Sequence, residues 1–244
     1  MNLVIDIGNT LAKVGVFKDG ELQYREAREK WEIDELMALG TNHNVQNVIL
    51  STVAGALAGP LREALDSRFV FMELNAATPL PIANRYRTPE TLGKDRLAAV
   101  VGAFVLFPRQ ACLVVDAGTC ITYDVLNPEG EYLGGNISPG IGMRLRAMHQ
   151  FTARLPLVQP GPVEEWVGNS TETALRNGAQ VGALLEAEGF LQYCRSRFRG
   201  LKAIFTGGDA DFFAKRLKSE IFVNHNLVLI GLDQILNYNV KRLE

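Results

Sequence analysis

A short segment near the start of the chain joins a strand-like run to residues that can contact a phosphate. The apolar run that begins at Leu3 ends at Asp6, and Gly8, Asn9 and Thr10 follow it. Because glycine has no Cβ, backbone amides beside it can approach a ligand closely. A neighbouring carboxylate can hold a hard cation directly or through water. The segment therefore predicts a turn suited to a phosphorylated ligand, although alone it is equally typical of an ordinary hairpin turn.

The same pattern returns in the second half of the chain. The run Leu113–Val115 ends at Asp116, and Gly118 and Thr119 follow it. A third glycine-rich turn, Thr206–Gly208, lies after another apolar run. Ligands in open α/β sheets bind beyond strand ends, so we expect two turns for phosphates and one for a nucleoside. The alternative for Asp116 is a turn carboxylate that accepts hydrogen bonds from local amides.

Between these turns, Gly93-Lys94-Asp95-Arg96 precedes a nearly continuous apolar run. The Asp95 carboxylate could orient an alcohol and accept its proton, and the planar Arg96 guanidinium suits a substrate carboxylate. The structural alternative is that Asp95 caps the start of a helix with Arg96 as a surface partner. Residues alone leave both interpretations open.

Length and composition are typical of a soluble globular protein. The chain has 244 residues, of which 47% are hydrophobic and 21% charged, with a formal net charge of -2. We therefore expect an ample core, no nucleic-acid or membrane partner, and no secretory signal at the acidic N-terminus. The three cysteines form no CxxC pair, which fits reduced thiols in the cytoplasm.

The apolar residues recur with the two-residue period of strands in some segments and with the 3.6-residue period of helices in others. This pattern predicts an α/β fold with mixed sheets. In the first half we expect strands at Leu3–Asp6, Val14–Phe17, Glu21–Arg25, Val45–Val53 and Phe69–Leu74, and helices at Trp31–Leu39, Pro60–Ser67 and Leu97–Phe104. Pro108–Ala111 marks the expected junction. In the second half we expect strands at Ala111–Val115, Ile121–Leu126, Tyr132–Ile137 and Leu201–Phe205, and helices at about Gly142–Thr152, Thr171–Phe198 and Phe212–Lys218, with Val228–Leu232 preceding a terminal helix through Val240.

The motifs occur in one order along almost the whole chain. They are Asp6–Thr10, Gly93–Arg96, Asp116–Thr119, the glycine-rich stretch Gly134–Gly140, and Thr206–Gly208. In this combination the chain resembles the type III pantothenate kinases of the acetate and sugar kinase, heat-shock 70 and actin superfamily. The resemblance implies two ribonuclease-H-like (actin-like ATPase) domains, 1–107 and 108–244, with the active site in the cleft between them. It also implies a cytoplasmic homodimer that phosphorylates pantothenate with ATP in the first step towards coenzyme A.

The resemblance also assigns roles. Asp95 would be the general base, Asp116 would bind a monovalent cation (K⁺ or NH₄⁺), and Mg²⁺ would enter with ATP near Asp6. The ATP-binding residues would be Asp6, Ile7, Gly8, Asn9, Thr10, Leu11, Ala12, Lys13 and Thr119. The pantothenate-binding residues would be Tyr86, Gly93, Lys94, Asp95, Arg96 and Thr171, although Lys94 has no individual role.

Two of these assignments have structural alternatives. Tyr86 could be a half-buried loop aromatic, and Thr171 could be the N-cap of a helix, with Thr173 as a possible alternative in register. Arg144, Arg146 and Arg154 are expected to form a solvated basic face. At the level of function, the alternatives are a kinase for another small hydroxylated acid or sugar, and a non-catalytic nucleotide-binding regulator.

Overall fold

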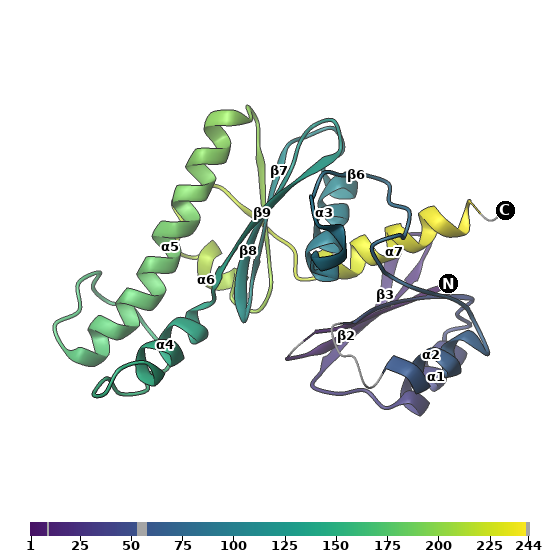
Figure 1. Cartoon of the computed structure of the whole chain (residues 1–244), viewed down its shortest axis with the longest axis horizontal. Helices are drawn as coiled ribbons and strands as arrows, with labels where there is room; N and C mark the ends of the chain where they lie inside the picture. Colours follow the sequence, from purple (N-terminus) through teal and green to yellow (C-terminus); the bar gives the residue numbers. More distant parts are fainter. Residues whose placement is uncertain (9, 53–57, 243–244) are drawn as a thin grey trace. The chain divides into compact units, whose positions relative to one another are not determined.

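The computed structural model describes residues 1–8, 10–52 and 58–242 (Figure 1). The chain forms two compact units. Unit 1 comprises Met1–Arg109, Pro128–Leu133 and Asn226–Glu244, and unit 2 comprises Gln110–Asn127 and Gly134–His225. Unit 1 thus contains the residues expected for the N-terminal domain. It also contains two segments from later in the chain, Pro128–Leu133 and Asn226–Glu244.

The sheet of unit 1 has five strands in the order β3-β2-β1-β4-β5. They are β1 (Asn2–Ile7), β2 (Ala12–Lys18), β3 (Glu21–Arg28), β4 (Asn47–Thr52) and β5 (Val70–Glu73). The first three are antiparallel neighbours, whereas β4 and β5 run parallel to β1. Asp19 and Gly20 both have positive φ at the turn between β2 and β3, as expected for an Asp-Gly hairpin turn. The predicted end of β4 at Val53 lies outside the described residues.

Helices cover both faces of this sheet. On one face, α1 (Ile33–Asn42) and α2 (Ala58–Asp66) contribute Leu36, Leu61 and Leu65 to a core with β1, β2 and β4. On the other face lies α7 (Leu227–Val240), which contacts the same three strands and packs against α3 (Lys94–Leu106). A short 3-10 turn, Pro89–Thr91, comes before α3.

The α3–α7 contact is close because each helix carries a glycine at the crossing. A Cβ at Gly231 would lie 1.8 Å from the Ala98 carbonyl oxygen, and one at Gly102 would lie 2.4 Å from that of Leu227. The run Val228–Leu232, expected to precede the terminal helix, is in fact its beginning. Its apolar residues are buried by helix packing, a state that a short apolar run does not distinguish from a buried strand.

The second sheet has six strands in the order β11-β10-β7-β8-β9-β6. They are β6 (Ala83–Asn84), β7 (Cys112–Ala117), β8 (Cys120–Leu126), β9 (Glu131–Pro139), β10 (Lys202–Thr206) and β11 (Phe222–Val223). The central strands β7 and β8 form the predicted antiparallel hairpin, and β10 runs parallel to β7. The two-residue strands β6 and β11 were not predicted, because such short pairings leave no periodic pattern in the sequence.

Three helices belong to unit 2: α4 (Ile141–Gln150), α5 (Thr171–Arg197) and α6 (Ala210–Ala214). The long helix α5, green in Figure 1, buries a stripe of residues spaced four apart against the sheet. These residues are Leu175, Ala179, Ala183, Ala187 and Leu191. The three alanines of this stripe let α5 pack closely in the core. The predicted helix Phe212–Lys218 is shorter and begins earlier, as α6.

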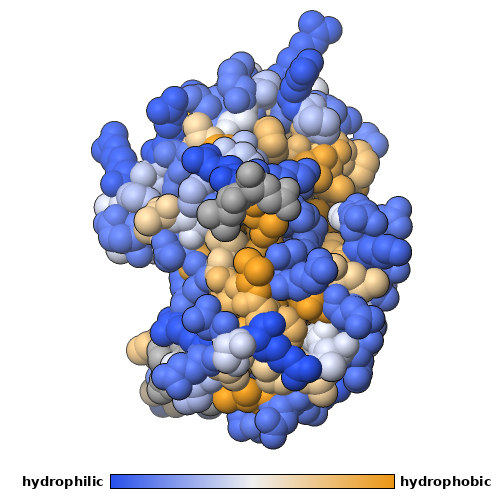
Figure 2. Space-filling view, turned by 90° about the vertical axis from the view of Figure 1, so that its right-hand side faces the viewer, coloured by the Kyte–Doolittle hydropathy of each residue, from blue (hydrophilic) through white to orange (hydrophobic). Residues whose placement is uncertain are grey.

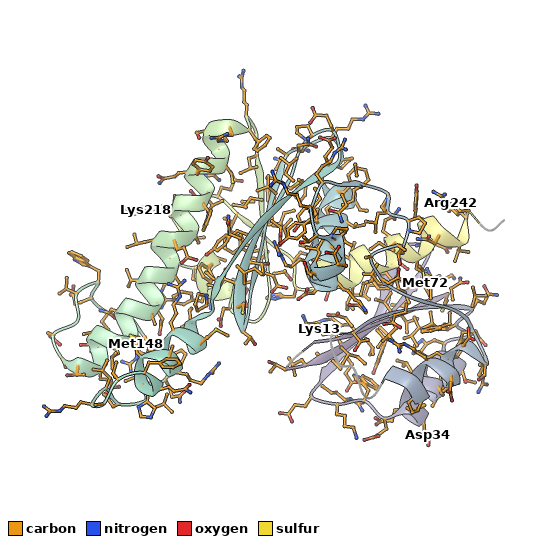
Figure 3. The ribbon with its side chains drawn as sticks, in the orientation of Figure 1. Lys13, Asp34, Met72, Met148, Lys218 and Arg242 are labelled. Carbon is orange, nitrogen blue, oxygen red and sulfur yellow. The ribbon has the colours of Figure 1, made fainter. Side chains whose placement is uncertain are left out.

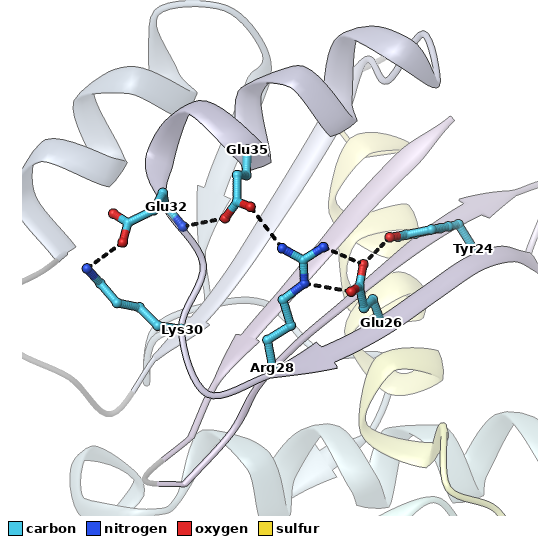
Figure 4. Close-up of polar contacts among 6 residues, drawn as sticks. All are labelled: Tyr24, Glu26, Arg28, Lys30, Glu32 and Glu35. Atoms are coloured by element: carbon cyan, nitrogen blue, oxygen red, sulfur yellow. Dashed lines mark hydrogen bonds and ion pairs between the residues drawn. The ribbon is translucent and has the colours of Figure 1, made fainter.

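Charged side chains cover the free edge of the first sheet (Figure 4). Arg28 of β3 bonds Glu26 on its own strand at 2.6 Å and Glu35 of α1 at 2.9 Å. Lys30 pairs with Glu32 at 2.6 Å in the segment that leads into α1. A charged edge strand disfavours pairing with another chain.

Hydrophilic side chains cover most of the face drawn in Figure 2, with apolar residues gathered between them. Among the described residues, no helix has the length and apolar character needed to cross a membrane.

Candidate active site

Asp6 is a buried carboxylate near the end of β1. It is 6% exposed, and its Oδ1 accepts a hydrogen bond of 2.9 Å from the Ser51 hydroxyl of β4. Lys13 (labelled in Figure 3) lies opposite it in the β1–β2 register. Burial raises the pKa of Asp6 to about 6, although the Ser51 hydrogen bond and the Lys13 charge lower it, and the Asp95 charge raises it further. The strand end therefore carries a carboxylate that is poorly hydrated and sensitive to nearby charge.

The predicted phosphate-binding segment 6–13 forms the hairpin between β1 and β2. The Gly8 amide donates to the Leu11 carbonyl at 3.1 Å. Thr10 and Leu11 are exposed at the tip, whereas Ala12 is buried in β2. Asn9 lies outside the described residues.

Asp95 lies in the first turn of α3, because this helix begins at Lys94, earlier than expected. Its Oδ1 accepts a hydrogen bond of 2.9 Å from the Arg96 amide, and a Cβ at Gly93 would lie 2.6 Å from the same oxygen. Asp95 is exposed, and its charge acts on Asp6 in the same unit. Unit 1 thus brings together two of the three predicted carboxylates, and Asp95 also contacts the helix N-terminus as in the structural alternative.

Arg96 is not the surface partner considered in that alternative. It is only 5% exposed, and its guanidinium carbon lies 5.7 Å from the centroid of the Tyr86 ring. Tyr86 in turn stacks on the buried Tyr132 ring, with centroids 6.1 Å apart and planes at 4°. A guanidinium that lies over the face of a ring that is itself stacked has little freedom. Unit 1 therefore places Tyr86 and Arg96 side by side, as their predicted common role requires.

Lys94 is held by a carboxylate. Its Nζ lies 3.2 Å from Glu73 Oε1, and Arg62 Nη2 donates to the same oxygen at 2.8 Å. This pairing gives Lys94 a structural role at the start of α3, next to Asp95.

In unit 2, three of the predicted glycine turns meet around Asp116. A Cβ at Gly207, whose φ is +90°, would lie 2.5 Å from Asp116 Oδ1 and 2.3 Å from the Ala117 carbonyl oxygen. A Cβ at Gly140 would lie 2.1 Å from the Gly118 carbonyl oxygen. The Gly140 amide also donates to the Thr119 carbonyl at 3.1 Å. These approaches admit only glycine, so the turn containing Asp116 and Thr119 is clamped on two sides.

Thr171 is the first residue of α5 and is exposed. The N-cap is Ser170, whose hydroxyl accepts from the Thr173 amide at 3.2 Å, while the Thr173 hydroxyl accepts from the Ser170 amide at 3.0 Å. Thr171 is therefore not the N-cap considered in the structural alternative, and its contact with a ligand stays a prediction.

The donor groups fit a cation that arrives with its ligand better than a resident metal. Within the described residues, no three His, Cys, Asp or Glu side chains gather as a metal site. Mg²⁺ in phosphoryl-transfer enzymes is often held by one or two carboxylates plus waters and substrate phosphates, and Asp6 could supply one such carboxylate. At Asp116, the carboxylate and the Ala117 carbonyl oxygen near Gly207 are oxygen donors of the kind a hard cation prefers.

Comparison with known proteins gives the family. A family model for type III pantothenate kinase matches residues 2–192. The chain belongs to the type III pantothenate kinases. It is 44% identical to a type III pantothenate kinase of Bacteroides fragilis, over 100% of both chains.

Solved structures agree in fold. A conserved Baf family protein from Campylobacter jejuni has a TM-score of 0.63 at 24% identity, over 98% of this chain and 99% of that one. The ROK hexokinase of Thermus thermophilus has a TM-score of 0.52 at 13% identity, over 98% and 99%. The predicted α/β class of the actin-like ATPase fold is confirmed, and so is the predicted family.

Two groups of polar residues near these turns were not predicted. Ser51 ends the apolar run of β4, and only its position opposite Asp6 in the parallel register marks it. Arg144 bonds Glu186 of α5 at 2.6 Å and is mostly buried, so the expected solvated basic face is wrong for this residue. No local sequence pattern marks Glu186, because its partners lie far away in the sequence.

Proposed function

We propose that this chain transfers the γ-phosphoryl group of ATP to the primary hydroxyl of pantothenate, giving 4′-phosphopantothenate and ADP, the first step of coenzyme A biosynthesis. The observation that carries this proposal is the match to type III pantothenate kinases over the whole chain. The contacts within each unit support it, because each predicted motif occupies a strand end, a helix start or a glycine turn.

We assign Asp95 as the general base on the pantothenate hydroxyl. Its carboxylate is exposed at the start of α3, and its charge acts on Asp6. Phosphoryl transfer passes through a loose transition state, so the base mainly orients the hydroxyl and accepts its proton late. An ordinary aspartate is sufficient for this role.

Arg96 and Tyr86 are proposed to bind pantothenate. Tyr86 restrains the Arg96 guanidinium, and a planar guanidinium can hold a carboxylate by two parallel hydrogen bonds. Because Arg96 is buried, little side-chain entropy remains to be lost when the substrate carboxylate binds. Gly93 and Lys94 complete the segment that presents Asp95.

The ATP phosphates are proposed to contact residues 6–13 and Thr119. Amide donors and cations around the transferred group stabilise its developing charge, which is the main protein contribution to phosphoryl transfer. Mg²⁺ bound with ATP would neutralise phosphate charge, and the Asp6 carboxylate would be its nearest protein partner. Asp116 would hold K⁺ or NH₄⁺ beside the second turn.

A homodimer is proposed on the basis of the exposed apolar side chains of unit 2. Phe151 after α4 is 80% exposed and Trp166 before α5 is 78% exposed, with Val167 and Leu185 also exposed. In the same unit, a groove of about 710 Å³ is lined by residues of α4 and α5 that include Met143 and Gly178, and by the exposed Phe151. Large apolar side chains exposed in this number often mark an association site. Thr171, close in sequence to Trp166, would then contact pantothenate across the interface, in a cytoplasmic enzyme.

Purified protein tests the reaction. ADP release coupled to a spectroscopic readout should require pantothenate and increase when potassium replaces sodium. Phosphorylation of a hexose but not of pantothenate would overturn the proposal. Light scattering after size exclusion tests the dimer: the native protein should have twice the mass of Leu185→Asp, and a monomeric native protein would contradict it.

A further inference from the structure

We infer that Glu186 and Arg144 are positioning residues that hold the turn containing Thr119 in its phosphate-binding conformation. This inference rests on the proposed function, because it explains how the second phosphate turn keeps its shape. All the groups involved belong to unit 2.

The two residues are the centre of a polar network that joins four elements. Glu186 of α5 accepts hydrogen bonds from Arg144 Nη2 of α4 at 2.6 Å and from the Ser138 hydroxyl of β9 at 2.5 Å. The Tyr123 hydroxyl of β8 donates to it at 2.9 Å. One carboxylate thus fixes two strands and a helix relative to α5.

The network reaches the phosphate turn through two successive residues. Arg144 Nε donates to the Pro139 carbonyl at 2.8 Å, and Ser138 is the residue before Pro139. Gly140 follows directly, donates its amide to the Thr119 carbonyl at 3.1 Å, and leaves no space for a Cβ beside Gly118. A shift of the Ser138–Gly140 backbone would therefore move the Thr119 turn.

Burial and charge indicate that these contacts are strong. The side chains of Arg144 and Glu186 are 20% and 28% exposed, so water and salt screen the pair less than a surface pair. Burial alone would raise the pKa of Glu186, but hydrogen bonds from Ser138, Arg144 and Tyr123 lower it below its usual value. The ionised carboxylate is thus the form that fits the site.

A purely structural role would be to pack α4 on α5. That role predicts that variants of these residues are less stable and that their affinities for ATP and pantothenate fall equally. A positioning role predicts that ATP binding weakens while pantothenate binding does not, because the network contacts the Thr119 turn directly.

The test compares Glu186→Gln and Arg144→Met with Glu188→Gln. Glu188 is on the same helix and is also half-buried, and it accepts a hydrogen bond of 2.6 Å from the Ser219 hydroxyl, away from the turn. Michaelis constants for both substrates, kcat, and the affinity for a fluorescent ATP analogue without pantothenate are measured for each variant.

We expect Glu186→Gln and Arg144→Met each to raise KM for ATP by about ten-fold, equivalent to about 1.4 kcal/mol. KM for pantothenate and kcat should stay within about two-fold, the ATP analogue should bind correspondingly more weakly, and Glu188→Gln should behave as the native protein. The double variant should be little worse than either single one, because both remove the same network.

Unchanged ATP affinity, or equal loss of affinity for both substrates, would overturn the inference. If Glu186→Gln does not fold, Tyr123→Phe removes one donor only, and the same selective loss of ATP affinity decides the question. If native protein does not phosphorylate pantothenate but Glu186→Gln still binds the ATP analogue more weakly, the proposed function fails and the inference about the turn stands.

Discussion

The hydroxyl of Ser51 donates a hydrogen bond of 2.9 Å to the Asp6 carboxylate, directly across the parallel pair β1–β4. This bond and the Lys13 charge do not compensate for the burial of Asp6, since its pKa is raised to about 6. The strand end therefore holds an ionised group at neutral pH at the expense of stability.

The first prediction is that Asp6→Asn stabilises the protein at pH 8 while abolishing kinase activity. Because the native state binds the Asp6 proton more tightly than the unfolded state, native stability falls as pH rises from about 4 to about 6 and stays lower above. Removing this ionisation should raise the free energy of unfolding at pH 8 by up to about 3 kcal/mol. Urea unfolding at pH 4 and pH 8 measures the effect, and a difference between variants that does not grow with pH would contradict it.

The second prediction concerns the general base. Asp95→Asn keeps an oxygen that can accept the Arg96 amide, so the start of α3 should remain intact. Turnover should fall by about 10²–10⁴-fold because the proton acceptor is lost, while the affinity for an ATP analogue stays unchanged. Glu90→Gln, an exposed acid in the preceding 3-10 turn, is the matched control. Native turnover in Asp95→Asn would remove this residue from the mechanism.

The third prediction separates the substrate carboxylate from the nucleotide. Arg96→Lys keeps the charge but loses the planar fork. It should raise KM for pantothenate by about ten-fold or more, consistent with loss of a charged hydrogen bond, with little change in KM for ATP. Arg87→Lys, at an exposed position next to Tyr86, serves as control. Equal changes for both substrates would count against a carboxylate contact.

The fourth prediction uses two adjacent glycines. Gly207→Ala should destabilise the protein by about 1–3 kcal/mol, because a Cβ would meet the Ala117 carbonyl at a φ of +90°. It should also weaken ATP binding, since the displaced turn lies against Asp116. Gly208→Ala, where no atom lies within 4 Å of the added Cβ, should be close to native. Thermal unfolding and ATP titration of both variants test this, and similar results for the two would exclude the clamp.

Much of the fold could be predicted because the apolar periods are clear where one face is buried. The hairpin β7–β8 and the long helix α5 are examples, and the glycine turns stood out because few residue types tolerate such close backbone approach. The start of α3 was harder, because Lys94 and Asp95 are polar and continue the helix without an apolar signal. Contacts such as Ser51 with Asp6 depend on strand register, which a single sequence does not specify.

For the candidate site, too, local motifs could be read from the sequence and contacts between distant residues could not. Asp95 and Asp116 were predicted as site residues from local motifs and family resemblance, and their roles stay predictions. Arg144 was misjudged because its partner Glu186 is 42 residues away. A basic side chain on an amphipathic helix looks solvated until a distant helix supplies its carboxylate.

The placement of α7 in unit 1 has a consequence for the living cell. Translation delivers residues 110–225 before α7, so unit 2 can finish folding while unit 1 still lacks the helix that covers α3 and β1. Most of unit 1 therefore precedes unit 2 in the chain, yet unit 1 is completed after it. Until then the apolar residues that α7 covers on α3 and β1 stay exposed, and a chain that ends shortly before Gly231 would contain all of unit 2 but only part of unit 1.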